Sequence, residues 1–217
     1  AYEISCILVG SEMCIRDRIR TVIFDIGNVL AGFDWYSFFR KQGFSEEMCA
    51  RLGRATVQSD DWKEYDRGCV SDERMLELFC ENDPEIAGEI RQALDDFHGL
   101  VTPYDYAIEW VKELKQKGYQ VLVLSNFSDK ALKECWHALD FLPYTDGGIL
   151  SFQDKVIKPM PEIYRLILDR YRLKPEECVF MDDAKQNVEG AKAAGIHAFV
   201  FENYAQAKNE LEKSGVR

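Results

Sequence analysis

Three short apolar segments of this sequence each end in polar side chains that could bind a metal ion or a phosphate group. The segments begin at Thr21, Tyr119 and Cys178, and each has the length and composition of a buried strand. The polar residues at their ends are Asp25, Ser125, Asn126, Asp182 and Asp183. Taken singly, each is most often an ordinary turn or helix-cap residue. Their joint occurrence is what indicates chemistry.

Together with Lys158, these residue types meet the needs of phosphoryl transfer. A carboxylate can attack phosphorus and form an aspartyl phosphate. The incoming phosphoryl group is anionic and repels that carboxylate, so a divalent cation and a lysine must offset the charge. Mg²⁺ prefers oxygen ligands, and one or two carboxylates with a backbone carbonyl suffice to hold it. Lys158 itself precedes Pro159, where a solvated side chain before a helix is the ordinary interpretation.

Strands that alternate with helices must bring these residues together. After Pro103 we expect helices at 106–117, 129–140, 159–171, 187–194 and 205–213, and strands at 119–124, 148–152, 178–181 and 197–201. This alternation predicts an α/β fold, a Rossmann-like doubly wound parallel sheet with helices on both faces. Ligands of such folds bind beyond the carboxyl ends of the strands, where all the polar groups would lie.

The segment 35–100 has a different character, because it holds helical patterns and no convincing strand. Ser45 and Ser71 each precede acidic residues, as helix N-caps do, and Asp83-Pro84 indicates a further helix start. We therefore predict a small helical cap over 35–100, inserted after the first strand of a core formed by 19–34 and 101–217.

Four ordered motifs resemble the haloacid dehalogenase (HAD) superfamily of hydrolases. They are FDIGNVL at 24–30, LSN at 124–126, KPMPEIY at 158–164 and MDDAKQNVEGAKAAGI at 181–196. The resemblance extends from residue 21 to about residue 201. It implies a Rossmann-like core with an inserted cap, and an enzyme that hydrolyses phosphoric monoesters with Mg²⁺.

For the metal, the resemblance implies a role for each residue of two motifs. Asp25 would be both the nucleophile and a Mg²⁺ ligand, and Gly27 would offer its backbone carbonyl. Asp183 would be the main ligand from the acidic loop, with Asp182 supporting the site directly or through water. Asn187 would either brace this loop or serve only as a helix-start residue.

For the phosphate, the resemblance assigns the other two motifs. Ser125 and Asn126 would hold the transferring group, and Lys158 would bridge it to the nucleophile. The implied function is a magnesium-dependent phosphatase that hydrolyses a small phosphorylated metabolite through an aspartyl-phosphate intermediate. Hexose phosphates are the first substrates to consider.

One position departs from the pattern of most phosphatases in the family. These carry a second Asp two residues after the nucleophile, as general acid and base, but here that residue is Gly27. Positioned acid–base catalysis contributes about 10²–10⁴-fold to a rate. Asp34 and Asn28 are the nearest replacements, although an Asn cannot act as an acid and Asp34 could be a turn residue.

The form FDIGNV resembles a subgroup that includes the bacterial α-D-glucose-1-phosphate phosphatase, and so does the cap stretch YDRGCVS at 65–71. An anomeric phosphate leaves a hemiacetal hydroxyl, which is more acidic than a simple alcohol. Such a leaving group would partly compensate for a missing acid.

Three other functions are open on the same residues. A haloacid dehalogenase attacks carbon with the same Asp and needs no magnesium, but that subgroup typically lacks the Asp182-Asp183 pair. A phosphomutase normally needs the acid at position 27. A catalytically weak binding or regulatory protein is supported only by Gly27 and opposed by the retained Asp25 and Lys158.

Substrate specificity is expected from the aromatic residues of the cap. Most of them would form the small core of the cap itself. Trp62 and Tyr65 stand beside charged residues, which makes them the first candidates for substrate contact. Arg67 could meet a distal polar group of the substrate or merely pair with Asp66.

Composition excludes several classes of protein. The 217 residues are 47% hydrophobic and 12% aromatic, which excludes a disordered chain. A net charge of −11 argues against nucleic acid and anionic membranes as partners, and no apolar run reaches the ~20 residues of a membrane span. The seven cysteines form no CxxC pair, which favours reduced thiols and a cytoplasmic location.

The first eighteen residues look unrelated to the domain. Their run SEMCIRDR resembles a translated sequencing adapter, so we predict a non-native or flexible extension at 1–18 and begin the domain near Ile19.

Overall fold

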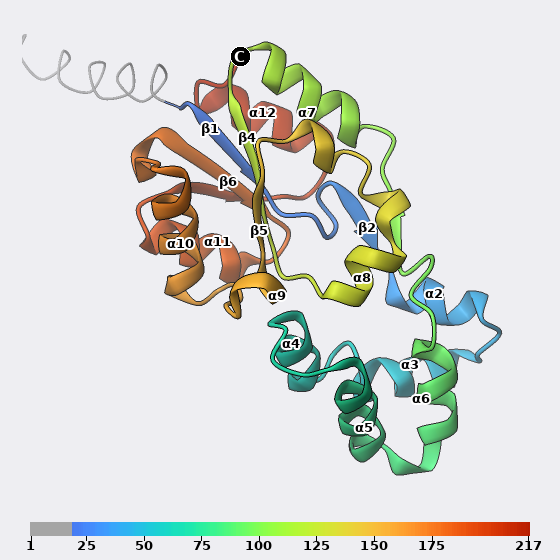
Figure 1. The fold of residues 1–217 in the computed structure, drawn as a ribbon. Helices are drawn as coiled ribbons and strands as arrows, with labels where there is room; N and C mark the ends of the chain where they lie inside the picture. Colours follow the sequence, from blue (N-terminus) through green and yellow to red (C-terminus); the bar gives the residue numbers. More distant parts are fainter. Residues whose placement is uncertain (1–18) are drawn as a thin grey trace, which may run out of the picture.

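The computed structural model describes residues 19–217, so the predicted extension at 1–18 lies outside the described residues. Five parallel strands form the central sheet in the order β5-β4-β1-β6-β7, which confirms the predicted parallel α/β architecture (Figure 1). The strands are β1 (Thr21–Phe24), β4 (Gln120–Ser125), β5 (Gly148–Leu150), β6 (Cys178–Asp182) and β7 (His197–Val200).

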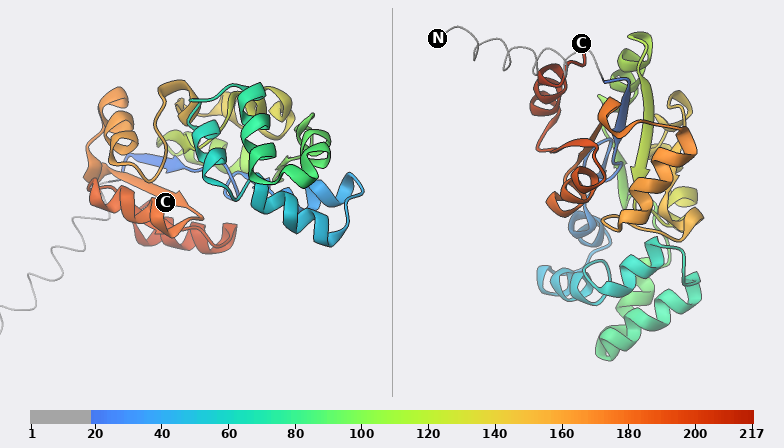
Figure 2. Two further views of the ribbon diagram at one scale, coloured as in Figure 1. Left: turned by 90° about the horizontal axis from the view of Figure 1, so that it is seen from below. Right: turned by 90° about the vertical axis from the view of Figure 1, so that its left-hand side faces the viewer.

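Helices cover both faces of this sheet, because successive side chains of a strand point to opposite faces. Val22 and Phe24 of β1 contribute to the hydrophobic cluster under α7 (Ala107–Gln116) and α12 (Tyr204–Lys213). Ile23 belongs to a second cluster under α10 (Pro161–Tyr171) and α11 (Lys185–Ala193). The result is the three-layer arrangement seen in Figure 2.

The segment 35–100, which we call the cap, consists of helices joined by short turns and loops. Its helices are α2 (Trp35–Lys41), α3 (Glu46–Ala55), α4 (Asp60–Asp66), α5 (Asp72–Asn82) and α6 (Ala87–Leu94). Ser45 and Ser71 are N-caps, as predicted, since their side chains accept hydrogen bonds from Met48 N and Arg74 N. The group lies beyond the end of the sheet toward which the strands run (Figure 1).

A two-stranded antiparallel ribbon joins the cap to the rest, and sequence analysis did not predict it. The chain enters the cap through β2 (Ala31–Phe33) and leaves through β3 (Val101–Pro103). Each strand has three residues, and Gly and Pro are weak strand formers, so no strand pattern is visible in the sequence.

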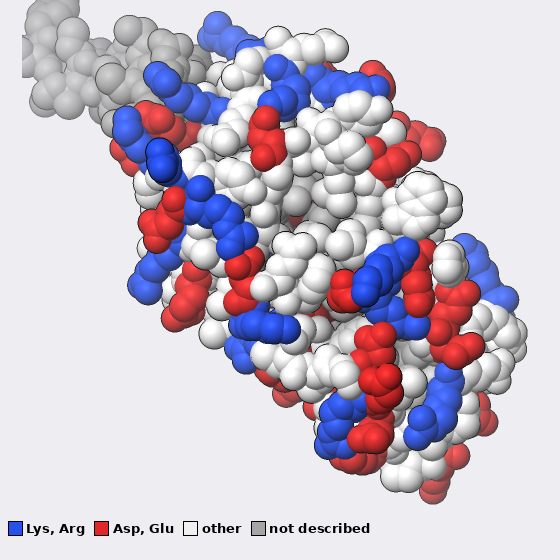
Figure 3. Space-filling model, in the orientation of Figure 1, with Lys and Arg blue, Asp and Glu red and all other residues white. Residues whose placement is uncertain are grey.

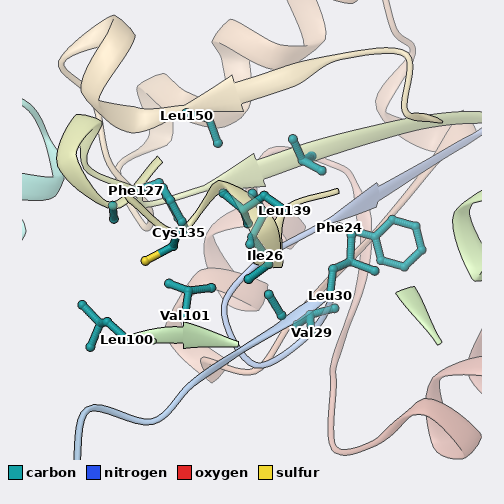
Figure 4. Close-up of a cluster of buried hydrophobic side chains, with 14 of the residues drawn as sticks. Phe24, Ile26, Val29, Leu30, Leu100, Val101, Phe127, Cys135, Leu139 and Leu150 are labelled. Atoms are coloured by element: carbon teal, nitrogen blue, oxygen red, sulfur yellow. The ribbon is translucent and has the colours of Figure 1, made fainter. Parts of the chain in front are cut away.

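A buried hydrophobic cluster ties this ribbon to the sheet (Figure 4). It combines side chains from the end of β1 and the turn after it, the β3 strand, the end of β5 and the region of α8 (Asp129–Glu134). The labelled members are Phe24, Ile26, Val29, Leu30, Leu100, Val101, Phe127, Cys135, Leu139 and Leu150. These contacts anchor both connections to the cap in the core.

Most predicted elements are shifted by one or two residues at an end, and two differ more in the structure. The helix expected at 129–140 ends at Glu134 and continues as a 3₁₀ turn at Trp136–Ala138, which buries Cys135 and Ala138. The strand expected at 148–152 ends at Leu150, and a short helix, α9 (Ser151–Asp154), follows at once. This early turn brings Ser151 beneath the cap.

The surface carries both signs of charge. Figure 3 shows basic and acidic side chains interleaved over one face, most densely on the cap. Arg74, for example, pairs with both Glu77 and Glu81 on α5. Among residues 19–217, no helix is both long and apolar enough to cross a membrane.

Candidate active site

The strand register brings the nucleophile candidate and its neighbours together. Phe24, the last residue of β1, pairs with Val123 of β4 and with Met181 of β6. Asp25 comes next and is therefore level with the ends of both neighbouring strands. Its Oδ1 accepts a hydrogen bond from Ser125 Oγ at 2.7 Å and another from the backbone N–H of Ile26 at 2.7 Å.

Lys158 lies between two buried carboxylates. Its Nζ is 2.8 Å from Asp25 Oδ1 and 2.6 Å from Asp182 Oδ2, and the lysine side chain is 1% exposed. Burial acts to lower the pKa of Lys158, but the charges of Asp25 and Asp182 outweigh it and the pKa is raised. The lysine therefore remains positively charged inside the protein.

Asn126 meets the site in a way that the sequence did not reveal. Its side chain accepts a hydrogen bond from the backbone N–H of Lys158 at 2.7 Å and donates one to the Lys158 carbonyl at 3.0 Å. The amide thus pins the loop that carries the lysine. Asn126 also lines the cavity beside Asp25. Because its side-chain amide is already bonded to Lys158, its backbone is the part that is left to contact a ligand.

The acidic loop presents its two carboxylates differently. Asp182 is fully buried and accepts hydrogen bonds from Lys158, from the Ala184 N–H at 2.8 Å and from Asn187 Nδ2 at 2.9 and 3.1 Å. Asp183 is exposed toward the cavity. Asn187 therefore braces Asp182, while Asp183 is the carboxylate of the pair that can reach a ligand.

Asn28 is a site residue whose importance sequence analysis missed. Its backbone is left-handed, with φ of 56°, a conformation that Asn tolerates better than most residues. Its Nδ2 donates to Asp183 Oδ2 at 2.9 Å, and its Oδ1 accepts from the Phe33 N–H at 3.0 Å. One amide thereby positions the acidic loop against the turn after β1. The only signal was its place three residues after the nucleophile.

The carboxylates form a site whose donor set fits a divalent cation. Asp25, Asp182 and Asp183 each offer an oxygen, and these oxygens lie within 4.8 Å of one another. Burial and the charge of Asp182 raise the pKa of Asp25 to about 7, although Lys158 opposes this. A cation would favour the ionised form that a nucleophile needs. Asn187 Oδ1 is buried and has no hydrogen-bond partner among the described residues, so a metal-bound water could serve it.

A cavity of about 410 Å³ opens between the carboxyl end of the sheet and the cap. Its core side carries Asp25, Ser125 and Lys158, and its cap side carries Trp62 and Asp66. Pockets of a few hundred cubic ångströms suit small-molecule ligands. The cavity is therefore large enough for a small metabolite held directly over the nucleophile.

Of the three predicted cap contacts, the structure brings one to this cavity. Trp62 lines it. Tyr65 is buried and donates its hydroxyl proton to Asp72 at 2.7 Å, away from the cavity. Arg67 pairs with Glu64 rather than Asp66, at 3.1 Å. Tyr65 thus stabilises the cap. Arg67 also donates to Met160 Sδ at 2.8 Å, so it joins the cap to the core instead of meeting a ligand here.

The structure also gives distinct places to Asp34 and Asp66. Asp34 is the N-cap of α2, and hydrogen bonds from Ser37 lower its pKa, so it is a poor proton donor. Asp66 lines the cavity, and burial raises its pKa to about 7, helped by the charge of Asp25. From the sequence, Asp66 is expected only as a surface partner of Arg67.

Several known proteins are similar to this chain in sequence. A phosphatase of Mycobacterium tuberculosis is 25% identical over 207 residues, which cover 88% of this chain and 91% of that protein. Other curated relatives, from mouse and rat, are much longer, and the chain spans 19% of their length.

Solved structures show the same fold. A HAD family enzyme of Bacteroides thetaiotaomicron, in complex with magnesium and inorganic phosphate, matches with a TM-score of 0.64 and 21% identity over 87% of this chain and 98% of that one. The L-2-haloacid dehalogenase of Xanthobacter autotrophicus, with chloropropionic acid covalently bound, matches with a TM-score of 0.59 and 20% identity over 92% of this chain and 84% of that one.

A match to one protein family spans most of the domain. The model of the haloacid dehalogenase-like hydrolases aligns with residues 19–195. This range contains all the strand-end residues and Lys158. The chain therefore belongs to the haloacid dehalogenase-like hydrolase family.

Proposed function

We propose that this protein is a magnesium-dependent phosphatase that hydrolyses a small phosphorylated metabolite through an aspartyl phosphate on Asp25. One observation carries the proposal. Asp25 is buried, and its Oδ1 is held by Ser125 and Lys158 beside a second, exposed carboxylate, Asp183. The phosphatase of Mycobacterium tuberculosis and the magnesium–phosphate complex of the Bacteroides enzyme support the same chemistry.

Asp25, the Gly27 carbonyl and Asp183 would hold the Mg²⁺ ion. Asp182 is occupied by Lys158, Asn187 and a backbone N–H, so it supports the site by positioning the lysine. The bound ion would offset negative charge on the phosphoryl group and on the nucleophile. The backbone hydrogen bonds of the turn after β1 leave the Gly27 carbonyl unused, in keeping with this role.

The side chains around Asp25 divide the work of the reaction. Ser125, Lys158 and the Ile26 N–H all meet Oδ1, which leaves Oδ2 as the oxygen for attack on phosphorus. As the Asp25–phosphorus bond forms, the ester oxygen leaves with its alcohol. Lys158 holds its charge next to the phosphoryl group throughout, because it is buried between two carboxylates. Water then hydrolyses the aspartyl phosphate and frees Asp25.

For the substrate, we propose a compact metabolite, with hexose phosphates first among them. The phosphate would lie over Asp25, and the rest of the molecule would face Trp62 and Phe33, which line the same cavity. An aromatic ring can cover the apolar face of a sugar. The cap over 35–100 would thus select the substrate that the core formed by 19–34 and 101–217 hydrolyses.

The experiment is phosphate release from a panel of small esters, hexose 1-phosphates included. Activity should require Mg²⁺ and disappear with a chelator. Asp25→Asn should abolish it, by at least about 10⁴-fold, since the nucleophile is lost. Asp183→Asn should raise the Mg²⁺ concentration needed for half-maximal activity by about 10–100-fold.

The same assay separates the alternatives. Full activity of Asp25→Asn would overturn the mechanism. Chloride release from a haloacid without Mg²⁺, and no phosphate release from any ester, would indicate a dehalogenase. Exposed Asp60, which pairs with Lys63 on the cap, offers a matched Asp→Asn control that should keep the wild-type rate.

A further inference from the structure

The cap contributes a further carboxyl to the lining of the cavity that contains the nucleophile. Asp66 is the last residue of α4 and lines the cavity that also contains Asp25 and Lys158. The charges of Asp25 and Lys158 both act on Asp66, one raising its pKa and the other lowering it. A carboxyl of the cap thus shares one ligand space with the nucleophile of the core.

The core holds this part of the cap in place. Ser151 Oγ donates to the Asp66 carbonyl at 2.5 Å and accepts from the Phe127 N–H at 2.9 Å. Lys155 Nζ donates to the carbonyl of Gly68. Position 68 has no room for a side chain, because a Cβ there would lie 2.6 Å from the Phe152 carbonyl oxygen. The backbone on both sides of Arg67 is therefore tied to α9 at a close approach that glycine permits.

The environment of Asp66 keeps a proton available near neutral pH. Burial is the largest influence and raises its pKa to about 7, and the charge of Asp25 adds to this. Interaction with Trp62 and the positive charge of Lys158 act in the opposite direction. A group that is partly protonated and partly ionised near the working pH is suited both to donate and to accept a proton.

The position that usually supplies this proton has no side chain. A Cβ added to Gly27 would meet only the Phe33 Cβ, at 4.0 Å, so there is open space where an acid would stand. Asp34, the other nearby candidate, caps α2. Among the described residues that line the cavity, the carboxyls are Asp25, Asp66 and Asp183, and two of these serve the nucleophile and the metal.

We propose that Asp66 is the general acid and base of this phosphatase, delivered by the cap in place of the residue missing at position 27. The inference rests on the proposed function and deepens it. In the first step the Asp66 carboxyl gives its proton to the ester oxygen as the phosphorus–oxygen bond breaks and the Asp25–phosphorus bond forms, so that a neutral alcohol leaves. In the second step the Asp66 carboxylate takes a proton from the water that attacks phosphorus, and Asp25 leaves as a carboxylate.

The test compares phosphate monoesters whose leaving groups differ in acidity. An alkoxide needs a proton in order to leave, whereas p-nitrophenolate does not. Asp66→Asn should therefore lower kcat for alkyl phosphates by about 10²–10⁴-fold and for p-nitrophenyl phosphate by less than about tenfold. Gly27→Asp in the Asp66→Asn background should restore alkyl phosphate turnover, since it returns an acid to the usual position. Asp60→Asn, on the same helix, should match the wild type with every ester.

A merely structural role predicts a different result. If Asp66→Asn lowers kcat equally for every ester, or leaves alkyl phosphate turnover unchanged, the proposal is wrong. Circular dichroism and a thermal melt verify folding of the variant, and Asp66→Ser is the second variant, held to the same two outcomes. Failure of the proposed function itself would appear separately, as absence of Mg²⁺-dependent phosphate release in the wild type, and would overturn this inference with it.

Discussion

The two sides of the cavity are held together by different kinds of interaction. On the core side, polar groups from distant parts of the chain bond directly to one another, as Asp25 does with Ser125 and Lys158. On the cap side, aromatic rings pack mainly against each other. Trp62 stacks with Phe79 and Phe97, with ring centres 5.9 and 6.0 Å apart.

This contrast separates the residues that would carry out the reaction from those that would select the substrate. The core groups that surround Lys158 are buried and bonded to one another, so removal of one leaves a charge without its partner. The cap residues are held by hydrophobic packing, which tolerates exchange at some positions and not at others. We expect changes in the core to affect both stability and rate, and most changes in the cap to affect stability or substrate affinity alone.

The largest effect should follow the loss of the buried lysine. Lys158→Met removes the positive charge between Asp25 and Asp182 while keeping most of the side-chain volume. Two buried carboxylates then lack their partner, and we expect the free energy of unfolding at pH 8 to fall by about 3–5 kcal/mol. Denaturant unfolding measures this, and phosphate release should be lost in the same variant.

The matched control is an exposed lysine. Lys63 pairs with Asp60 on the cap, and both side chains are largely exposed. Lys63→Met should therefore change stability by less than about 1 kcal/mol. Equal losses of stability in the two variants would mean that the buried contacts of Lys158 stabilise the protein no more than an exposed ion pair does. The contrast between core and cap would then be wrong.

The cap side can be tested with its two neighbouring aromatic residues. Trp62→Ala should cost about 3–5 kcal/mol of stability and raise KM, because Trp62 both packs in the cap and lines the cavity. Tyr65→Phe should lower the free energy of unfolding by about 1 kcal/mol, because the hydrogen bond to Asp72 is lost. It should leave KM unchanged. Thermal melts and steady-state kinetics at a temperature below both melting points measure the two quantities. A raised KM in Tyr65→Phe would place that residue with the substrate after all.

The last expected effect concerns pH and Asp66. Its pKa in the folded protein, about 7, lies above the ordinary value of 3.8, so folding favours the protonated form. The stability that this proton provides is present at low pH and is lost as pH rises from about 4 to about 7. An Asn at this position does not ionise. In metal-free protein, the melting temperature of the wild type should thus fall relative to that of Asp66→Asn over this range.

For Asp60, the same measurement should show stability changing with pH in the opposite direction. Its hydrogen bond with Lys63 lowers its pKa, so its contribution to stability is present at neutral pH and is lost on acidification. Asp60→Asn should therefore destabilise slightly near neutral pH and converge with the wild type in acid. A pH profile of Asp66→Asn that runs parallel to the wild type would show that Asp66 ionises in the folded protein as it does in water.

Much of the fold could be read from the chain. Apolar runs that end in Asp25, Ser125 and Asp182 mark three adjacent parallel strands, and helical periodicity marks the layers that cover them. These patterns are local, because a buried strand needs consecutive apolar residues and a helix needs them at every third or fourth position. The ribbon of β2 and β3 escaped prediction, since three-residue strands that contain Gly and Pro carry no such pattern.

The site was less completely predictable. The motif residues implied by family resemblance lie together at the end of the sheet, but two contributions appeared only in three dimensions. Asn28 reaches across to Asp183, which is 155 residues away, and Asp66 arrives from a helix with no strand-end signal. Tyr65 and Arg67, which had seemed better candidates, do not line the cavity: Tyr65 bonds to Asp72, and Arg67 bonds to Glu64 and to Met160 of the core.

The sequence by itself determined which groups could do chemistry and in which order the strands and helices follow, because strand periodicity, helix caps and motif residues are local properties of the chain. Only the tertiary structure decided which of these groups face one another. The pairing of Asp25 with Lys158, the brace from Asn28 and the approach of Asp66 depend on the strand register and on how the cap lies against α9. Such contacts join residues far apart in sequence, and their energies depend on burial, which exists only once the chain is folded.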